Sequence, residues 1–472
     1  MYRQGLGDCF LLSFPKGSGK FVHVMIDCGI VLGTSEPDQV MNRVAEDIKT
    51  ATGKKLDVLV ITHEHWDHLS GFDAKQARSV FDQIQIGQLW LAWTEDEGNA
   101  VANQLRDERE KKKEAALAAL TELDNRGLAG QAMGMSSLLG FFGERSGGEG
   151  DTGLRGTAGA LAYVKSKCDP TILETGGKPV AIPGIAGVRT YVLGPPMDTS
   201  LLKKANPRKN EGYSLGGGVI SLADAFLAAL DPHDERAQPF AKSLRKPMSQ
   251  LAPAMREASE ESSRTGIDGY LDEANEWRRI DDAWLAVGEH LALQLDSATN
   301  NTSLVLAFEF DESKEVLLFV GDAQAGNWRS WDSHEWTVED KDGTSRKVTA
   351  EDLLRRTVFY KVGHHGSHNA TLKDKGLERM ISPRLAAVIP VDTAVAHEVK
   401  GWKHMPLPGI RTRLKEKCAV VFQSDLNPEK LRDIPGVRWQ NSRKKFDVRM
   451  KNKTTKKVET VRKQSLYTDY FI

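Results

Sequence analysis

Metal-ligating side chains are concentrated in the segment Thr62-His63-Glu64-His65-Trp66-Asp67-His68, which holds three of the chain's 12 histidines. The segment follows an apolar run of branched residues, which is typical of a strand that is covered on both faces. In extended backbone His63 and His65 project to the same side, where both imidazoles can reach one metal ion at about 2.0–2.1 Å. Asp67 and His68 come after the chain turns, so we expect them to hold a second metal ion.

Two other interpretations of this segment are weaker. The zincin motif His-Glu-x-x-His needs a second histidine four residues after the first, but the residue four after His63 is Asp67. A polar loop with incidental histidines does not account for so many ligand-type side chains in a row, because histidine is the commonest metal ligand. The segment therefore predicts metal ligands.

Two later segments carry the same kind of side chain at the ends of predicted strands. Gly321-Asp322 ends the apolar run 315–320, where a carboxylate could bridge two metal ions. Lys361-Val362-Gly363-His364-His365-Gly366-Ser367-His368 begins at the end of the run 358–362 and continues beyond it. Alone, a Gly-Asp pair usually marks a turn and a histidine pair usually lies at the surface. Three such segments at three strand ends indicate one two-metal site.

Together these segments resemble the metallo-β-lactamase fold superfamily, and within it the chain is most similar to the hydrolase domain of the ComEC-type competence proteins. The resemblance rests on His63-x-His65-x-Asp67-His68, Gly321-Asp322 and His364-His365-Gly366-Ser367. Further likeness lies in Gly5-Leu6-Gly7-Asp8-Cys9, Ile26-Asp27-Cys28-Gly29, Asn301-Thr302-Ser303-Leu304-Val305 and His404-Met405-Pro406. It covers discontinuous pieces of the chain, outside which lie the helical blocks and the basic C-terminal part.

The resemblance implies an α/β fold, an αββα sandwich with the metals at one edge of its sheets. Carried over residue by residue, it implies that His63 and His65 hold metal one, that Asp67 and His68 hold metal two, and that Asp322 bridges the two ions. The last ligand of metal two is then His364 or His365. We favour His364, because it is nearer the end of its strand.

The resemblance also implies roles for the side chains around the metals. Asp67 would orient the nucleophile, and Lys361, His365 and His404 would lie near the substrate phosphate. His365 and His368 are left to contact that phosphate or to protonate the leaving group. Ser367 and His368 would contact the substrate. Asp8 and Asp27 are interpreted as residues that support the ligands or form turns.

One position departs from the superfamily pattern. The usual third histidine of metal one precedes the middle hairpin by a few residues, and Asn300 and Asn301 occupy that region here. Metal one would then have an amide ligand or an open position. The nearest upstream histidines, His290 and His233, are expected to be ordinary helix or loop residues. The ComEC-type pattern itself carries asparagine there, which makes loss of function a less natural inference.

The composition along the chain predicts one α/β core interrupted by helical insertions. Residues 95–123 are charged, alanine-rich and free of proline, which favours an exposed helix, and a glycine-rich stretch follows at 146–150. We expect the first half of the core in residues 1–94, a helical insertion in 95–174, a core connection in 175–197, a second helical insertion in 198–299, the second half of the core with the metal site in 300–430, and a basic C-terminal segment in 431–472.

Apolar alternation and turn residues predict the elements of the core. Strands are expected at residues 9–14, 21–26, 56–61, 87–93, 188–193, 303–310, 315–320, 358–362 and 385–391. Helices are expected at residues 38–51 and 71–81.

Composition and charge narrow the classes of function. The 472 residues include 64 Lys plus Arg against 65 Asp plus Glu, a formal charge of −1, so no overall field draws the molecule onto nucleic acid. Residues 442–463 are strongly basic, which fits either a nucleic-acid patch or a solvated hairpin or tail. The four cysteines form no Cys-x-x-Cys pair, and no apolar run reaches the roughly 18 residues of a membrane span. These features predict a cytoplasmic protein that does not enter the membrane.

Nitrogen and oxygen ligands without thiolates suit two divalent metal ions, with zinc the default and manganese or iron as alternatives. We therefore expect a phosphodiesterase or nuclease that uses a metal-bridging hydroxide on nucleic acid or a small phosphodiester. One alternative is a hydrolase of a small ester, lactone or cyclic nucleotide in a pocket walled by the insertions. Another is a partner-binding protein whose helical insertions contact a protein partner and whose metal site is structural.

Overall fold

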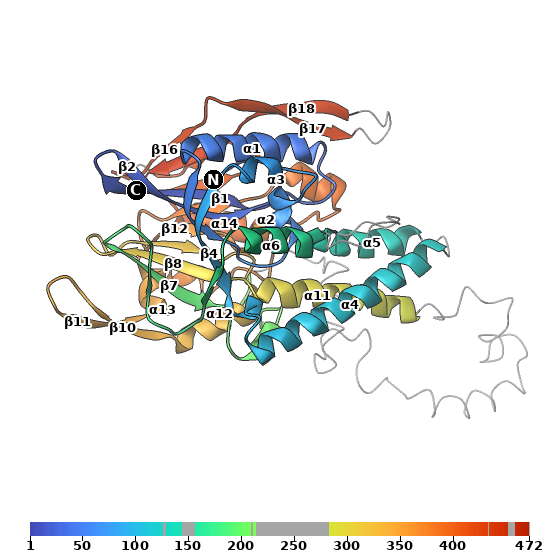
Figure 1. The fold of residues 1–472 in the computed structure, drawn as a ribbon, viewed down its shortest axis with the longest axis horizontal. Coiled ribbons are helices and arrows are strands. Elements are labelled where there is room, and N and C mark those ends of the chain that lie inside the picture. The colour runs from blue at the N-terminus through green and yellow to red at the C-terminus, as the bar shows by residue number, and fades with distance from the viewer. Residues whose placement is uncertain are drawn as a thin grey trace, which may run out of the picture.

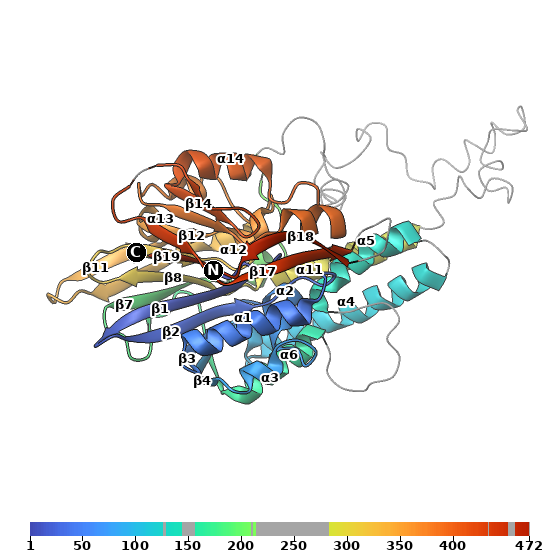
Figure 2. The same ribbon diagram turned by 90° about the horizontal axis from the view of Figure 1, so that it is seen from above.

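Two β-sheets lie face to face between layers of helices (Figures 1 and 2). The structure, a computed structural model, describes residues 1–125, 129–143, 156–208, 211–213, 283–432, 434–451 and 458–471. The layers agree with the αββα arrangement that the resemblance implies. Most of the predicted second helical insertion, including His233, lies outside the described residues.

The first sheet has five strands in the order β1-β2-β3-β4-β5. Its strands are β1 (Cys9–Gly17), β2 (Lys20–Cys28), β3 (Lys55–Val60), β4 (Gln85–Ala92) and β5 (Pro170–Leu173). β1 and β2 form an antiparallel hairpin, and β2 to β5 are parallel neighbours. The carboxyl ends of β2 and β3 therefore meet at one edge of this sheet.

The second sheet has eight strands in the order β15-β14-β13-β12-β9-β8-β7-β6. Its strands are β6 (Val180–Ala181), β7 (Val188–Gly194), β8 (Val305–Phe310), β9 (Val316–Phe319), β12 (Thr357–Lys361), β13 (Ala386–Ile389), β14 (Val420–Gln423) and β15 (Glu429–Lys430). β9, β12, β13 and β14 are parallel, so their carboxyl ends also share an edge.

Helices cover both outer faces of the sandwich, and three of them form an arm beside it. The helices are α1 (Pro37–Ala51), α2 (Trp66–Leu69), α3 (Arg78–Phe81), α4 (Ala100–Asn125), α5 (Ala129–Leu139), α6 (Gly156–Lys167), α7 (Thr199–Leu202), α11 (Ala283–Asn301), α12 (Ala325–Ser330), α13 (Ala350–Arg355) and α14 (Pro408–Lys417). Figure 1 shows α4, α5 and α11 side by side to the right of the sheets. They bury a small apolar cluster of their own, made by Ala116, Leu120, Ala132, Met135, Leu139 and Ala292.

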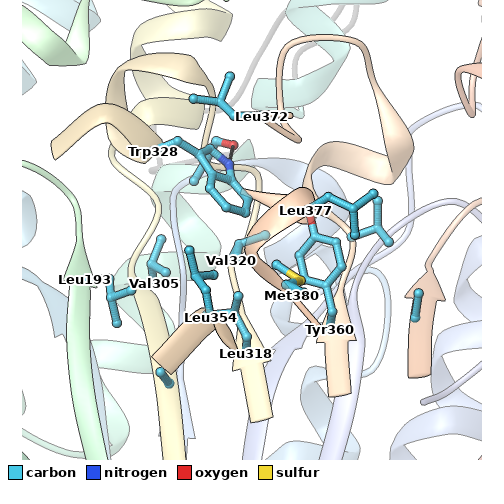
Figure 3. Packing of buried hydrophobic residues seen from close by; sticks show 14 of the residues in the cluster. Leu193, Val305, Leu318, Val320, Trp328, Leu354, Tyr360, Leu372, Leu377 and Met380 are labelled. Atoms are coloured by element: carbon cyan, nitrogen blue, oxygen red, sulfur yellow. Dashed lines mark hydrogen bonds between the residues drawn. The ribbon is translucent and has the colours of Figure 1, made fainter. Parts of the chain in front are cut away.

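The apolar core forms three layers because side chains alternate between the faces of each strand. The middle layer lies between the sheets and holds Phe10, Val60, Phe308 and Phe319. One outer layer lies under α1, α3 and α6. The other lies under α12, α13 and α14, where Trp328 and Tyr360 are fully buried among leucine and valine side chains (Figure 3). Burial on both faces explains the continuous apolar runs in the sequence.

Three small two-stranded sheets complete the described part of the chain. They pair β10 (Glu335–Glu339) with β11 (Ser345–Thr349), β16 (Arg438–Asn441) with β19 (Thr468–Phe471), and β17 (Lys445–Lys451) with β18 (Val458–Ser465). The basic C-terminal segment thus contains a hairpin, β17–β18, which lies over α1 in Figure 1. No helix in the described part of the chain is long and apolar enough to span a membrane.

The predicted core strands match the observed ones to within a few residues, and the predicted helix at 38–51 corresponds to α1. The helix predicted at 71–81 was wrong for most of its length: only its last turn, α3, is α-helical. Gly71 instead lies in a tight 3₁₀ turn, Ser70–Phe72, where a side chain would meet the carbonyl oxygen of Cys28 at 2.8 Å. Packing against β2 thus overrides the helical pattern.

Candidate metal centre

The three predicted ligand segments meet at one edge of the sandwich. The His63–His68 loop follows β3, Asp322 follows β9, and the His364-His365 pair follows β12. Because β3 is parallel to β2, and β9 to β12, the ends of these strands point to the same edge. Sheet topology therefore brings together residues that are hundreds of positions apart in the chain.

Glycines let neighbouring loops approach the His63–His68 loop closely. A side chain at Gly29 would meet the backbone of Asp67 at 2.3–2.4 Å, and one at Gly7 would meet the carbonyl oxygen of Asp67 at 2.7 Å. The same carbonyl accepts a hydrogen bond from the backbone NH of Asp8 (3.0 Å). The loop thus owes its position to two residues that lack a Cβ.

His63 and His65 face each other. The Nε2 atom of His63 is 3.1 Å from the Nδ1 atom of His65, and both rings are buried. The other nitrogen of His63, Nδ1, is 3.1 Å from the hydroxyl of Thr62, which itself donates to Asp27 (2.6 Å). Thr62 is therefore an acceptor for the Nδ1–H of His63, and Nε2 is the atom left for a ligand.

A second group of donor atoms lies beside this pair. Ligand atoms of Asp8, His68, Asp322 and His365 all lie within 4.8 Å of one another, and the four side chains are buried. Nε2 of His68 is 3.2 Å from a carboxylate oxygen of Asp322, and Nε2 of His365 is 2.7 Å from Asp67. The four side chains thus offer converging nitrogen and oxygen atoms that could hold a cation.

The outer nitrogens of both rings in this group are held by fixed acceptors. Nδ1 of His68 is 2.7 Å from Asp27, and Nδ1 of His365 is 2.9 Å from the carbonyl oxygen of Pro390. Such acceptors orient a metal-binding imidazole and set its tautomer. Asp27 thus fixes the ring of His68. It and His365 lie in the left-handed backbone region (φ 54° and 53°), a strain that functional sites often retain.

The side chains at this edge fit a cation. Several of their buried polar atoms have no hydrogen-bond partner: Asp8 Oδ1, His65 Nε2, Asp67 Oδ1, His68 Nε2, Asp296 Oδ1, Asn300 Oδ1 and Asp322 Oδ2. Buried polar groups in proteins are almost always paired, so a cluster of unpaired ones calls for an explanation. Imidazole and carboxylate donors converging in a buried site are the ligands that divalent cations prefer.

Lys361 occupies a different place from the one expected. Its side chain is buried, and its ammonium is bonded to Asp8 (2.6 Å), Asp322 (3.0 Å) and the carbonyl oxygen of Gly321 (2.6 Å). Burial lowers the pKa of this group, but Asp8 and Asp322 outweigh that effect and raise it. Lys361 thus neutralises carboxylates inside the cluster and is not exposed to a substrate phosphate.

The pKa values of the facing histidines, His63 and His65, are shifted in the opposite direction from that of His68. Burial lowers the pKa of His63 well below its ordinary value and that of His65 to about 3, so both are neutral at pH 7. Burial also lowers the pKa of His68, but Asp322, Asp8 and Asp27 outweigh it and raise that pKa well above its ordinary value. Asp322 itself has a lowered pKa, because Lys361 and His68 outweigh the effect of burial.

The remaining predicted residues are spread around the cluster. Nε2 of His364 is 4.0 Å from Asp322, further than His365, so the geometry favours His365 over His364 as the last ligand. The hydroxyl of Ser367 is 3.1 Å from Nδ1 of His364, and His368 lies 3.3 Å from Asn206. His404 is exposed, and no described contact joins it to the cluster.

Part of the helical arm also reaches the site. Phe141 stacks on His65 with ring centroids 5.2 Å apart, and Phe142 meets the same ring edge-on at 5.0 Å. Arg109 of α4 pairs with Glu64 (2.5 Å), the residue between the two facing histidines. Sequence reasoning missed these contacts, because nothing local in residues 95–174 indicates where the arm docks.

Comparison with known families gives a match for the first part of the chain. Residues 7–133 match the model of the metallo-beta-lactamase superfamily. This stretch of the chain is therefore similar to the metallo-beta-lactamase superfamily. Members of this superfamily are generally metal-dependent hydrolases. Neither the curated proteins nor the solved structures gave a significant match.

The matched stretch contains Asp8 and the whole His63–His68 loop, and it ends before Asp322 and His365. The later ligands therefore rest on their position in the fold. The match does not single out the ComEC-type group among the members of the superfamily.

Proposed function

We propose that this chain is a hydrolase that uses two divalent cations, with zinc the first choice, to cleave phosphodiesters. The observation that carries the proposal is the buried cluster of imidazole and carboxylate atoms that converge without hydrogen-bond partners. His63 and His65 would hold one cation. His68 and His365 would hold the other with Asp67, and Asp322 would lie between the two.

The chain's own residues prepare this site for hydrolysis. When bound, two such cations supply a water of lowered pKa and hold the attacking and leaving oxygens. Asp27 and the carbonyl of Pro390 fix the rings of His68 and His365, and Lys361 holds Asp322 in place by its short ion pair. Phe141 and Phe142 cover one face of His65 and keep bulk water from it.

Lys400 takes the place of Lys361 as a candidate contact for substrate phosphate. Its ammonium lies 5.9 Å from the ring centre of Phe141 and 5.7 Å from that of Trp402, and these two rings stack on each other. Burial lowers the pKa of Lys400 to about 8, so the group is still largely protonated at pH 7. Phe141 links this cation to His65.

Nucleic acid is the substrate to test first. The motif resemblance to ComEC-type hydrolase domains supports it, and so does the exposed basic hairpin β17–β18. A small phosphodiester, cyclic nucleotide or lactone is the second candidate, because Phe141 and Phe142 wall off one side of the cluster.

The test compares metal-loaded wild-type protein on bis-p-nitrophenyl phosphate, single-stranded DNA, RNA and a panel of lactones. Turnover of the phosphodiesters is expected, and a variant carrying His63→Ala with Asp322→Ala should lose it. The matched control is His23→Ala, a histidine of β2 that bonds to Ser13 away from the cluster. Unchanged turnover in the double variant would exclude the proposal, and tight metal binding without any turnover would favour a structural metal in a partner-binding protein.

A further inference from the structure

His65 has one ring nitrogen that the geometry described so far does not explain. Its Nδ1 faces His63, but its Nε2 is buried and has no hydrogen-bond partner. The ring is fully buried and packs against two phenylalanines. A ring held this tightly cannot turn its second nitrogen to solvent.

A carboxylate of helix α11 lies opposite this nitrogen. Oδ1 of Asp296 lies 3.9 Å from Nε2 of His65, and it too is buried without a hydrogen-bond partner. The other oxygen of Asp296 accepts a hydrogen bond from the side-chain amide of Asn300, one helical turn later (3.1 Å). Two unpaired buried atoms thus face each other across a gap slightly too long for a hydrogen bond.

The tautomers of the metal-free site leave this nitrogen of His65 without a proton. The hydroxyl of Thr62 donates to Asp27, so Nδ1 of His63 must carry the proton that Thr62 accepts. Nε2 of His63 is then bare, and the 3.1 Å contact with His65 requires the proton on Nδ1 of His65. A neutral His65 therefore has a bare Nε2, which offers no proton to Asp296.

We propose that Asp296 is a positioning residue for His65. When the first cation takes the place of the proton on Nδ1 of His65, Nε2 of the same ring donates a hydrogen bond to Asp296 Oδ1. The proton on Nδ1 is lost and Nε2 takes one up, so the ring stays neutral. This inference rests on the proposed function, since it assumes that His63 and His65 hold a cation. A metal-bound imidazole usually donates its other NH to a carboxylate or carbonyl in this way.

The two asparagines that replace the expected histidine have separate roles under this proposal. Asn300 anchors the carboxylate of Asp296. The side chain of Asn301 is fully used elsewhere, because it donates to the carbonyls of Leu202 and Lys204 and accepts from the backbone of Gln324 and Asn327. Asn301 therefore fixes α11 against α7 and α12, and Asn300 works inside the site.

The test measures cobalt(II) and zinc binding by titration calorimetry in wild type, Asp296→Ala, Asp296→Asn and the control Ser297→Ala, on the same helix. Asp296→Ala should weaken the first cation about 10–100-fold and leave the second unchanged. Asp296→Asn keeps an acceptor oxygen and should stay within about tenfold of wild type. Ring ¹⁵N signals of His65 should show the proton on Nδ1 without metal and on Nε2 with zinc.

The outcomes separate this inference from the proposed function. Wild-type affinity in Asp296→Ala, or an Nε2 of His65 that stays unprotonated with zinc, would overturn the positioning role while the hydrolase proposal stands. A changed cobalt(II) absorption spectrum in Asp296→Asn at full occupancy would show that Asp296 is itself a ligand, and it would also overturn the positioning role. Failure of the wild type to bind any divalent cation would overturn both.

Discussion

Charge balance decides how the individual residues of the cluster behave. Asp8 and Asp322 are buried carboxylates that share one ammonium, that of Lys361. In a protein interior an unpaired charge costs several kcal/mol, so these three residues depend on one another in the absence of metal. A divalent cation placed beside Asp322 would supply part of the same compensation.

Replacing Lys361 by methionine tests this dependence. We expect the free energy of unfolding of the metal-free protein to fall by about 3–5 kcal/mol, because the variant leaves buried carboxylates uncompensated. Added zinc should raise the melting temperature of the variant more than that of the wild type. The control is Lys55→Met, which removes an exposed partner of Asp57. Equal losses in the two variants, measured by chemical denaturation, would contradict the prediction.

The two adjacent histidines after β12 differ in what holds them, and substitution should separate them. His365 is fixed by the carbonyl of Pro390 and faces Asp67, whereas His364 is 4.0 Å from Asp322 and bonds to Ser367. We expect His365→Ala to reduce the bound metal, measured by elemental analysis after dialysis, from two ions to one per chain. His364→Ala should keep both ions. The reverse pattern would restore His364 as the ligand.

Candidate site residues that lie close together in the sequence could be predicted from it, whereas those that reach the site from distant parts of the fold could not. The alternation of His63 and His65 in extended backbone predicts their shared direction, because a strand has a period of two. Asp296 gave no such signal, since an aspartate in a helical block is ordinary until its contact with His65 is known. A carboxylate four residues before Asn300 in a helix was the one available hint.

At the scale of elements, the position of the ligand loop depends on backbone contacts that only glycine allows. Gly29 follows β2 and lies directly against Asp67, so the loop after β3 is set by the strand beside it. Sequence patterns located these strands well, because continuous apolar runs mark strands buried on both faces. They failed for residues 71–77, where contact with β2 replaces a helix by turns.

Alanine at Gly29 should therefore displace the ligand loop. Its Cβ would lie 2.4 Å from the carbonyl oxygen of Asp67, an overlap that backbone must move to relieve. We expect a loss of stability of about 1–3 kcal/mol and weaker binding of both cations. Gly177→Ala is the matched control, because its Cβ would meet only ordinary contact at 3.7 Å. Denaturant titration and zinc calorimetry of both variants check the result.

An ion-pair cluster between α14 and the segment before β13 gives a prediction for pH. Hydrogen bonds from Arg413 hold the pKa of Glu378 at about 2, below its ordinary value of 4.5. A folded pKa below the unfolded one stabilises the fold above pH 4.5, and this contribution fades as pH falls towards 2. Glu378→Gln should therefore cost about 1–2 kcal/mol at pH 7 and much less at pH 3. The exposed Glu335→Gln should show little change between these pH values.

At the scale of the whole molecule, segments outside the sandwich contact it at its functional edge. The arm docks Phe141 on His65, and α11 carries Asp296 to the same ring. The β17–β18 hairpin is tied to this side as well, because Arg462 forms an ion pair with Asp392, which follows β13 close to Pro390. The sequence indicated that such segments exist, but their docking depends on tertiary contacts that no local pattern encodes.

The basic hairpin offers a test of the substrate at this scale. Several cations of the hairpin and of the residues just before it are already paired within the protein, Lys444 with Asp47 and Arg449 with Glu36 among them. Arg443, Lys445 and Lys463 are exposed and remain the candidates for contact with nucleic-acid phosphates. If single-stranded DNA binds there, its affinity should fall steeply with salt, because each neutralised phosphate releases counterions.

Replacing these three cations by serine should therefore lower the affinity for single-stranded DNA at low salt and reduce the slope of log K against log salt by about 2. Fluorescence anisotropy across a salt series measures both. Turnover of bis-p-nitrophenyl phosphate should be unchanged, since the hairpin does not enter the metal cluster. The control replaces Lys16, Lys20 and Lys54, three exposed lysines at the opposite edge of the first sheet. Equal slopes in both triple variants, or an affinity that does not depend on salt concentration, would contradict nucleic acid as the substrate. Either result would favour a small phosphodiester enclosed by the arm.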